Sequence, residues 1–113
     1  MKAIYFFILF SFAISSCNNS KSNNNKVNTE LKIKPNRYNV AFLIMNGTYN
    51  TELTAPFDIF QHTQYRKNIK AMNVFTIANT LEPITTFEGL RILPDFDYTK
   101  SNLPIIDILV IPS

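Results

Sequence analysis

The sequence predicts an α/β protein built on a mostly parallel sheet, and three observations support this fold class. Residues 38–45 and 105–112 are continuous apolar runs without alternation of apolar and polar side chains. This pattern is typical of strands that are covered on both faces. Residues 51–65 change to the period of an amphipathic helix, which can cover one of those faces. Buried-type strands that alternate with a helix indicate an α/β sheet.

The first strand is expected over residues 38–45, and the turn pair Asn46 and Gly47 ends it. The helix follows over about residues 51–65. Its stripe has the spacing i, i+4, i+7, i+11 and consists of Leu53, Phe57, Phe60 and Gln64, with Ile59 beside it. Pro56 either stands at the first helical position or lies inside a helix capped by Thr51, where it frees the carbonyl of residue 52.

The second strand is expected over residues 72–78. Residues 82–93 then read as a hairpin-like excursion, in which Gly89 supplies the turn. The last strand, within residues 105–112, has Asp107 at its entrance. One helix cannot cover both faces of these buried-type strands, so we expect one face to be bare, one edge to lie open and the domain to be incomplete.

The N-terminal residues have the pattern of an exported lipoprotein. Residues 1–16 hold a basic start at Lys2 and an apolar run that is too short to span a membrane, as expected for a signal peptide. Residues 14–17, ISSC, resemble the bacterial lipobox, in which the cysteine is acylated. Cys17 is therefore expected to carry the lipid and to hold the protein at a membrane of the bacterial cell envelope. The alternative is an ordinary signal peptide with an incidental cysteine.

The segment after the leader is expected to be a tether. Residues 17–37 are rich in Asn and Lys and poor in apolar side chains, which predicts disorder. The formal net charge of the whole chain is +3, but residues 38–113 hold five basic and seven acidic side chains. The basic excess therefore belongs to the leader and tether, and we expect no nucleic-acid partner because no basic face is foreseen on the domain.

Residues 52–60, ELTAPFDIF, resemble the acid-Leu-x-Gly-Pro-x-x-x-Phe element of the DJ-one/PfpI family, within the class I glutamine amidotransferase-like superfamily. Pieces of residues 75–95 resemble the family's second strand and hairpin. Residues 107–112 resemble the strand that leads into Pro-Gly-Gly. The resemblance covers residues 38–113 and implies the N-terminal portion of a flavodoxin-like, mostly parallel sheet sandwich.

The resemblance implies that Glu52 is the acid that hydrogen-bonds a reactive cysteine and tunes its protonation. The family's cysteine lies on a strand-to-helix elbow later in the chain, and Cys17 in the leader is not that residue. Ala55 replaces the usual glycine, and Ser113 stands where the first glycine of Pro-Gly-Gly would be. The alternative is that Glu52 is only a helix-start carboxylate, stabilised by the helix dipole by about 0.3–1 kcal/mol.

Other polar residues give weaker signals. His62 is expected to be an exposed helix histidine without a second metal ligand. Asp95 and Asp97 are expected to be loop carboxylates, not a metal pair. The only glycines are Gly47 and Gly89, so there is no glycine-rich phosphate loop and no cofactor is expected.

Two functional hypotheses follow. In the first, the chain is the N-terminal part of a lipid-anchored DJ-one/PfpI-like protein. The intact relative would be a cysteine-dependent hydrolase, lyase or deglycase-like enzyme, or a ligand-sensing domain, and this chain would be inactive alone. In the second, it is a non-enzymatic membrane-anchored binding module, or the product of a decayed gene. This module would bind a partner through its uncovered face. The expected partners of the chain are the membrane, through the lipid anchor, and a second copy or a missing C-terminal half. The DNA beyond codon 113 distinguishes them, because only the first hypothesis requires an elbow cysteine there.

The lipobox makes one direct prediction. When the chain is expressed in a Gram-negative host, it should be cleaved before Cys17 and should partition into the detergent phase. The Cys17→Ala variant should stay unprocessed or become released, because it has no thiol to acylate. Mass spectrometry and detergent partitioning measure this. An unchanged mass and an unchanged partitioning in the variant would exclude the anchor.

Overall fold

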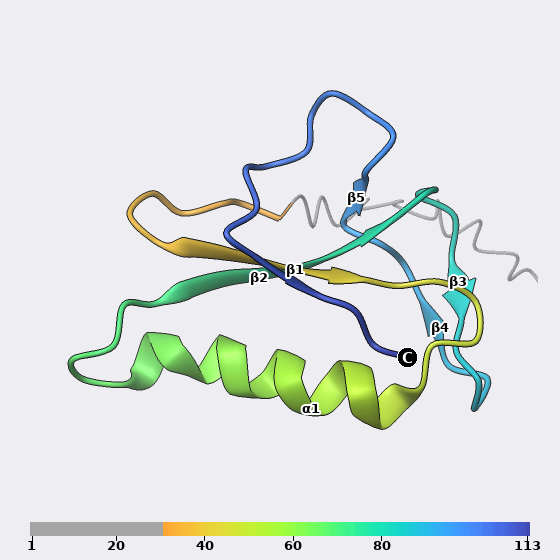
Figure 1. The fold of residues 1–113 in the computed structure, drawn as a ribbon, viewed down its shortest axis with the longest axis horizontal. Coiled ribbons are helices and arrows are strands. Elements are labelled where there is room, and N and C mark those ends of the chain that lie inside the picture. The colour runs from red at the N-terminus through yellow and green to blue at the C-terminus, as the bar shows by residue number, and fades with distance from the viewer. Residues whose placement is uncertain (1–30) are drawn as a thin grey trace, which may run out of the picture.

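The computed structural model describes residues 31–113, and the predicted leader with Cys17 lies outside them. A four-stranded sheet has the order β5-β2-β1-β6, with every neighbouring pair parallel, and a separate hairpin pairs β3 with β4 (Figure 1). The elements are β1 (Tyr38–Leu43), α1 (Asn50–Gln61), the 3-10 helix η1 (His62–Tyr65), β2 (Met72–Ala78), β3 (Ile84–Thr85), β4 (Arg91–Ile92), β5 (Phe96–Asp97) and β6 (Ile108–Val110). The predicted α/β class and the parallel sheet are thus confirmed.

The main core lies between the sheet and α1. Val40 and Phe42 of β1 are fully buried on this face, and Leu53 of α1 is 3% exposed. The ring of Phe42 lies against those of Phe57 and Phe60, at 5.2 and 6.1 Å between centroids. The i, i+4, i+7 spacing of the three helix side chains places them in one row, which is why this row packs on the sheet.

The helix agrees with one of the two alternatives for Pro56 and differs from its prediction in two details. It begins at Asn50 with Tyr49 as the N-cap, so the expected cap at Thr51 is wrong. Pro56 lies inside the helix, which is the second of the two alternatives given above. Ile59 is 69% exposed, so it does not pack on the sheet with the apolar stripe beside it.

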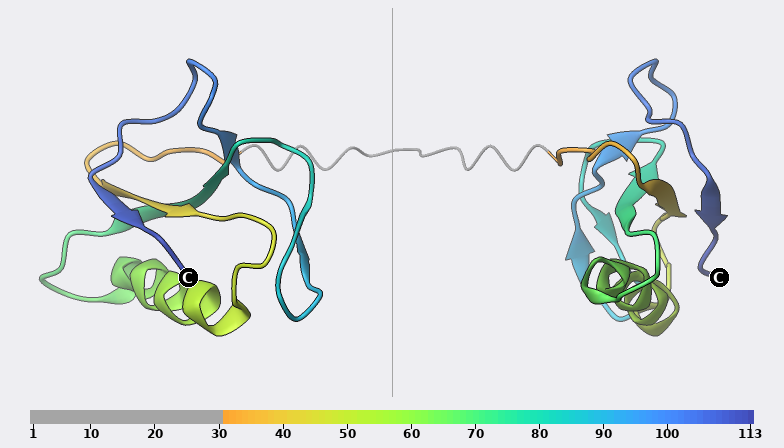
Figure 2. Two further views of the ribbon diagram at one scale, coloured as in Figure 1. Left: turned by 45° about the vertical axis from the view of Figure 1, so that its right-hand side comes forward. Right: turned by 90° about the vertical axis from the view of Figure 1, so that its left-hand side faces the viewer.

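The second face of the sheet is covered by coil instead of helix among residues 31–113 (Figure 2). Phe75 and Ile77 are 0% and 4% exposed there, because side chains from the coil before β1, from β5 and from the coil before β6 pack on them. These side chains are Ile33, Phe96, Leu103 and Ile106. The expected bare face is therefore wrong for β2, whereas Leu109 and Ile111 near the β6 edge stay 50% and 63% exposed.

The coil before β1 is held to the start of β2. The side-chain oxygen of Asn73 accepts the backbone N–H of Lys34 at 3.1 Å, and its amide donates to the Lys34 carbonyl at 2.9 Å. The same amide donates to the side-chain oxygen of Asn39 at 2.8 Å. Arg37 donates to the carbonyl of Met72 at 3.5 Å. The last residues of the segment expected to be a tether thus contact the sheet.

Each outer strand is preceded by a carboxylate that accepts a backbone N–H from its neighbour. Asp95 accepts the N–H and the hydroxyl of Thr76 at 2.7 and 2.8 Å. Asp107 accepts the N–H of Asn39 at 2.7 Å. These carboxylates replace strand carbonyls, so the N–H groups are satisfied before β5 and β6 begin.

The buried Asn73 supplies a stability prediction. Asn73→Ala removes three hydrogen bonds that join β2 to β1 and to the preceding coil, and should lower the free energy of unfolding by about 1–3 kcal/mol. Asn79→Ala, at an exposed position just after β2, is the matched control and should change it by less than about 0.5 kcal/mol. Urea unfolding of the full chain measures both. Equal effects would mean that the coil is not fastened through Asn73.

Candidate functional site

The candidate site lies at the carboxyl ends of β1 and β6, the edge at which ligands bind in open α/β sheets. Glu52, in the first turn of α1, reaches the chain just after β6. Its Oε2 atom accepts the backbone N–H of Ser113 at 2.7 Å and also the Ser113 hydroxyl. In addition, the N–H of Tyr49 donates to the Ser113 carbonyl at 3.4 Å. Parallel pairing thus brings together two residues that are 61 positions apart.

The loop between β1 and α1 is fixed by the β3–β4 hairpin. Asn46 accepts the N–H of Thr85 through its side chain at 2.8 Å. The N–H of Gly47 donates to the Thr85 carbonyl at 2.9 Å. The φ angle of Gly47 is 89°, a left-handed conformation that glycine adopts without strain. The ring centroids of Tyr49 and Phe87 lie 4.8 Å apart, so these two side chains pack together where the loop meets the hairpin.

A second carboxylate meets the start of α1. Tyr49 provides no side-chain cap, and Oε2 of Glu88 instead accepts the free N–H of Asn50 at 3.0 Å. A helix N-terminus favours negative charge and exposes unpaired N–H groups, so both Glu52 and Glu88 are stabilised there. The side-chain oxygen of Asn50 is buried and has no hydrogen-bond partner within the described residues.

This arrangement offers a carboxylate for proton transfer but no thiol. Glu52 is exposed, and its second oxygen atom leaves room for a further donor. The sequence has one cysteine, Cys17, which lies outside the part of the chain that the structure describes. Residues 31–113 therefore place an exposed carboxylate at this edge of the sheet and contain no cysteine.

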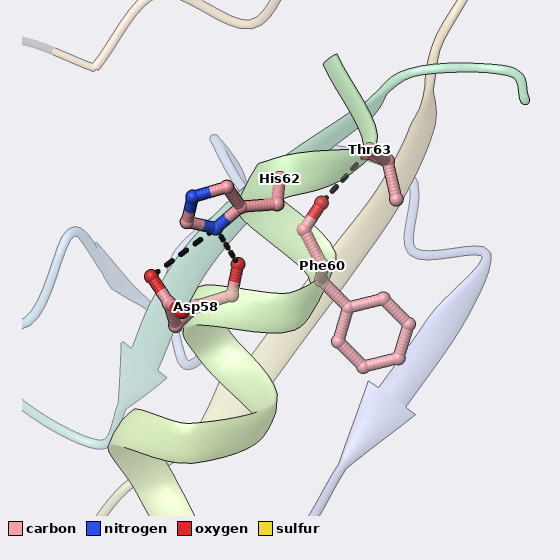
Figure 3. Close-up of polar contacts among 4 residues, drawn as sticks. All are labelled: Asp58, Phe60, His62 and Thr63. Atoms are coloured by element: carbon pink, nitrogen blue, oxygen red, sulfur yellow. Dashed lines mark hydrogen bonds and ion pairs between the residues drawn. The ribbon is translucent and has the colours of Figure 1, made fainter. Parts of the chain in front are cut away.

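His62 lies at the other end of α1, far along the helix from Glu52. Its Nδ1 atom lies 2.9 Å from the Asp58 carbonyl oxygen and 3.3 Å from the Asp58 carboxylate, and both side chains are more than half exposed (Figure 3). Within residues 31–113 no cluster of three or more metal-ligating side chains occurs. No helix in the same span is long and apolar enough to cross a membrane. His62 is thus an exposed helix-end residue.

Asp95 and Asp97 both accept backbone N–H groups. Asp97 lies in β5, so its expected place in a loop is wrong. Asp95 is committed to Thr76, as described above, and the buried Asp97 accepts bonds from Thr99. The Thr99 hydroxyl lies 2.7 Å from Oδ1 of Asp97 and the Thr99 N–H lies 2.9 Å from it. Both bonds stabilise the charged form of Asp97, the hydroxyl bond more than the N–H bond. They lower the pKa of Asp97 below its ordinary value of 3.8.

Comparison with known proteins gives a likeness in structure alone. No family model matches the chain, and no curated protein matches it. A ThiJ/PfpI family protein from Bacillus anthracis superposes with a TM-score of 0.51 and 25% identity, covering 73% of this chain and 38% of that protein. A DJ-1 superfamily protein from Agrobacterium tumefaciens gives 0.49 and 20%, covering 67% and 37%. A ThiJ/PfpI family protein from Pseudomonas syringae gives 0.49 and 17%, covering 85% and 36%.

The described residues are therefore similar in structure to part of a DJ-1/ThiJ/PfpI-type α/β domain. The chain spans little more than a third of the length of these solved proteins. The sequence resemblance to the DJ-one/PfpI family agrees with this likeness in fold.

The sequence alone indicated Glu52 but not its partners. The family resemblance marks Ser113 only as a departure from a glycine, and its contact with Glu52 depends on the register of β6. Glu88 and Asn46 gave no signal, because a single acidic or amide residue in a turn is common. The pair Tyr49 and Phe87 could have been suspected from two aromatic residues beside turn glycines.

Asp97 supplies a pH prediction. Because its pKa is lower in the folded state, its stabilising contribution is complete above the unfolded pKa of about 3.9 and is lost as the pH falls through the folded pKa. The stability difference between the unaltered chain and Asp97→Asn should therefore be largest near pH 7 and shrink below about pH 4. Thermal unfolding at several pH values measures it. A difference that stays constant down to pH 2 would contradict the proposed role of Thr99.

Proposed function

We propose that residues 38–113 supply the first part of a DJ-1/PfpI-like domain, in which Glu52 is the acid beside a reactive cysteine from a downstream segment. The complete protein would be a cysteine-dependent hydrolase, lyase or deglycase-like enzyme, or a ligand-sensing domain. The observation that carries this proposal is the position of Glu52, at the carboxyl ends of β1 and β6 and in contact with Ser113. By itself, the sequence given would have no cysteine-dependent activity.

Two features of the site support the proposal that a further segment or a ligand contacts it. The buried oxygen of Asn50 has no donor within the described residues, and an unpaired buried acceptor costs about 1–3 kcal/mol. A donor from a further segment or a ligand would remove that cost. Glu52 also keeps one carboxylate oxygen without a bond from residues 31–113, where a thiol could be held.

We further propose that Cys17 is acylated and anchors the protein to the bacterial cell envelope. The support is the sequence ISSC at residues 14–17, after a basic start and an apolar run. Several acyl chains on one residue bind a membrane stably, since each buried methylene contributes about 0.8 kcal/mol.

The second candidate function is a binding module without chemistry. The observation that favours it is the pair of apolar residues, Leu109 and Ile111, that stay exposed near the β6 edge. An open parallel edge can pair with a second copy or with another chain. This module would bind through β6 and would not need Glu52.

The two functions differ in their response at Glu52. The chain as given should show no hydrolase, lyase or deglycase activity. When a cysteine-bearing downstream half is supplied, activity should appear, and Glu52→Gln should lower it by about 10²–10⁴-fold because an amide cannot exchange the proton. Asp58→Asn removes an exposed carboxylate from the same helix and should leave activity unchanged.

The rate of thiol alkylation against pH gives an independent measurement. In Glu52→Gln the profile of the supplied cysteine should shift, because the group that tunes its protonation is changed. Full activity together with an unshifted profile would reduce Glu52 to a helix-start carboxylate. No activity in the unaltered protein after the downstream half is supplied would favour the binding module.

A further inference from the structure

Five basic side chains gather at the end of the domain opposite Glu52. We call this surface the basic end and define it as Lys34, Arg37, Arg66, Lys67 and Lys70. It lies where β1 and β2 begin and where η1 ends, at the left of Figure 1. All five side chains are at least partly exposed.

Hydrogen bonds around the first residue of β2 join the parts of the basic end. Arg37 donates to the Met72 carbonyl at 3.5 Å, and the Met72 N–H donates to the Thr63 hydroxyl at 3.1 Å. The Arg66 N–H donates to the Thr63 carbonyl at 3.2 Å. Lys70 lies over the ring of Tyr38, with its Nζ atom 4.1 Å from the centroid.

The charges of the basic end are not neutralised locally. The only ion pair found across residues 31–113 joins His62 to Asp58, so no carboxylate pairs with the five cations. Asp107 lies at this end of the sheet, where its carboxylate accepts the Asn39 N–H. Asp58 lines the same surface hollow as Arg66, and its ion-pair partner is His62. Glu52 and Glu88 lie at the opposite ends of the strands. The five cations therefore lie away from the two carboxylates at the start of α1.

Apolar side chains are exposed among these cations. Tyr65 is 75% exposed and Ile69 is 51% exposed. Both lie in the same short segment as Arg66 and Lys70. Ile59, which is 69% exposed, shares a surface hollow with Arg66 and Ile69, and the paired side chains of Asp58 and His62 also line it. Cations interleaved with aliphatic and aromatic side chains are typical of surfaces that rest on anionic membranes.

We propose that the basic end is a docking surface for an anionic lipid bilayer. The cations would approach the headgroups, while Tyr65, Ile69 and Ile59 would enter the boundary with the acyl chains. A nucleic acid would meet the charges but offers no apolar phase for these three side chains, so the bilayer fits better. The proposal does not need the acyl anchor, although Lys34 is 17 residues after Cys17, a span of at most about 60 Å.

A single tryptophan can test the contact, because the chain has none. In the full chain, Tyr65→Trp should show a blue-shifted emission on vesicles that contain phosphatidylglycerol, and brominated lipids should quench it. On pure phosphatidylcholine vesicles the shift should be absent. Tyr98→Trp, a control at a 45% exposed position outside the basic end, should not respond. The anchor and tether are common to all samples. Docking of the domain is therefore measured by the difference in emission shift between tryptophan at position 65 and tryptophan at position 98.

Charge variants identify the cause. Arg66→Glu, Lys67→Glu and Lys70→Glu together should remove the shift of Tyr65→Trp, and the affinity for anionic vesicles should fall by about tenfold or more. The matched control is Arg91→Glu with Lys100→Glu, which should retain the shift. Circular dichroism checks whether the triple Glu variant is folded. If that variant unfolds, the milder set Arg66→Gln, Lys67→Gln and Lys70→Gln takes its place. Salt at 0.5 M should abolish the shift in the unaltered background.

Three results would overturn the proposal. The first is an unchanged Tyr65→Trp emission on anionic vesicles. The second is an equal shift at residue 98, which would show that contact is not directed by the basic end. The third is tighter, equally charge-dependent binding to a short DNA duplex, which would assign the surface to nucleic acid.

Discussion

The parallel pairing of β1 with both β2 and β6 is the constraint on which the rest of the structure depends. β1 pairs with β2 along its whole length and with β6 opposite Val40 to Phe42. Its side chains alternate between the two cores, so each core needs β1 in this register. The pairing of Phe42 with Val110 also places Ser113 beside the start of α1. A shift of β6 by one residue would turn its apolar side chains to the wrong faces and would separate Ser113 from Glu52.

Patterns within short windows predicted the elements well. Apolar runs without alternation gave β1 and β2, and the helical period gave the row of Leu53, Phe57 and Phe60. The cap at Thr51 was mispredicted because a threonine near a helix start is a stronger signal than a tyrosine, although the hairpin supplies Glu88 instead. The position of Ile59 could not be decided from periodicity, because it lies at the border of the stripe.

Features that depend on distant contacts could not be predicted from the sequence. The coil around Ile33 looks like a polar spacer until Asn73 is known to bind Lys34. For the same reason, counting charges by segment assigned Lys34 and Arg37 to a tether and left the domain acidic. In three dimensions those two cations join Arg66 and Lys70. Of the candidate site, the family resemblance indicated Glu52 alone. The contacts of Ser113 and Glu88 and the unpaired oxygen of Asn50 depend on segments that are distant in the sequence.

The parallel pair of β1 and β6 has a consequence for biosynthesis. Its partners Val40 and Ile108 are separated by 68 positions, and a ribosome adds about 5–20 residues per second. One edge of the central strand therefore waits roughly 3–14 s for its neighbour to be translated. During that interval the N–H and C=O groups of β1 on that side are available to any extended segment nearby. Nascent copies on one messenger are consequently the most immediate competitors for this edge.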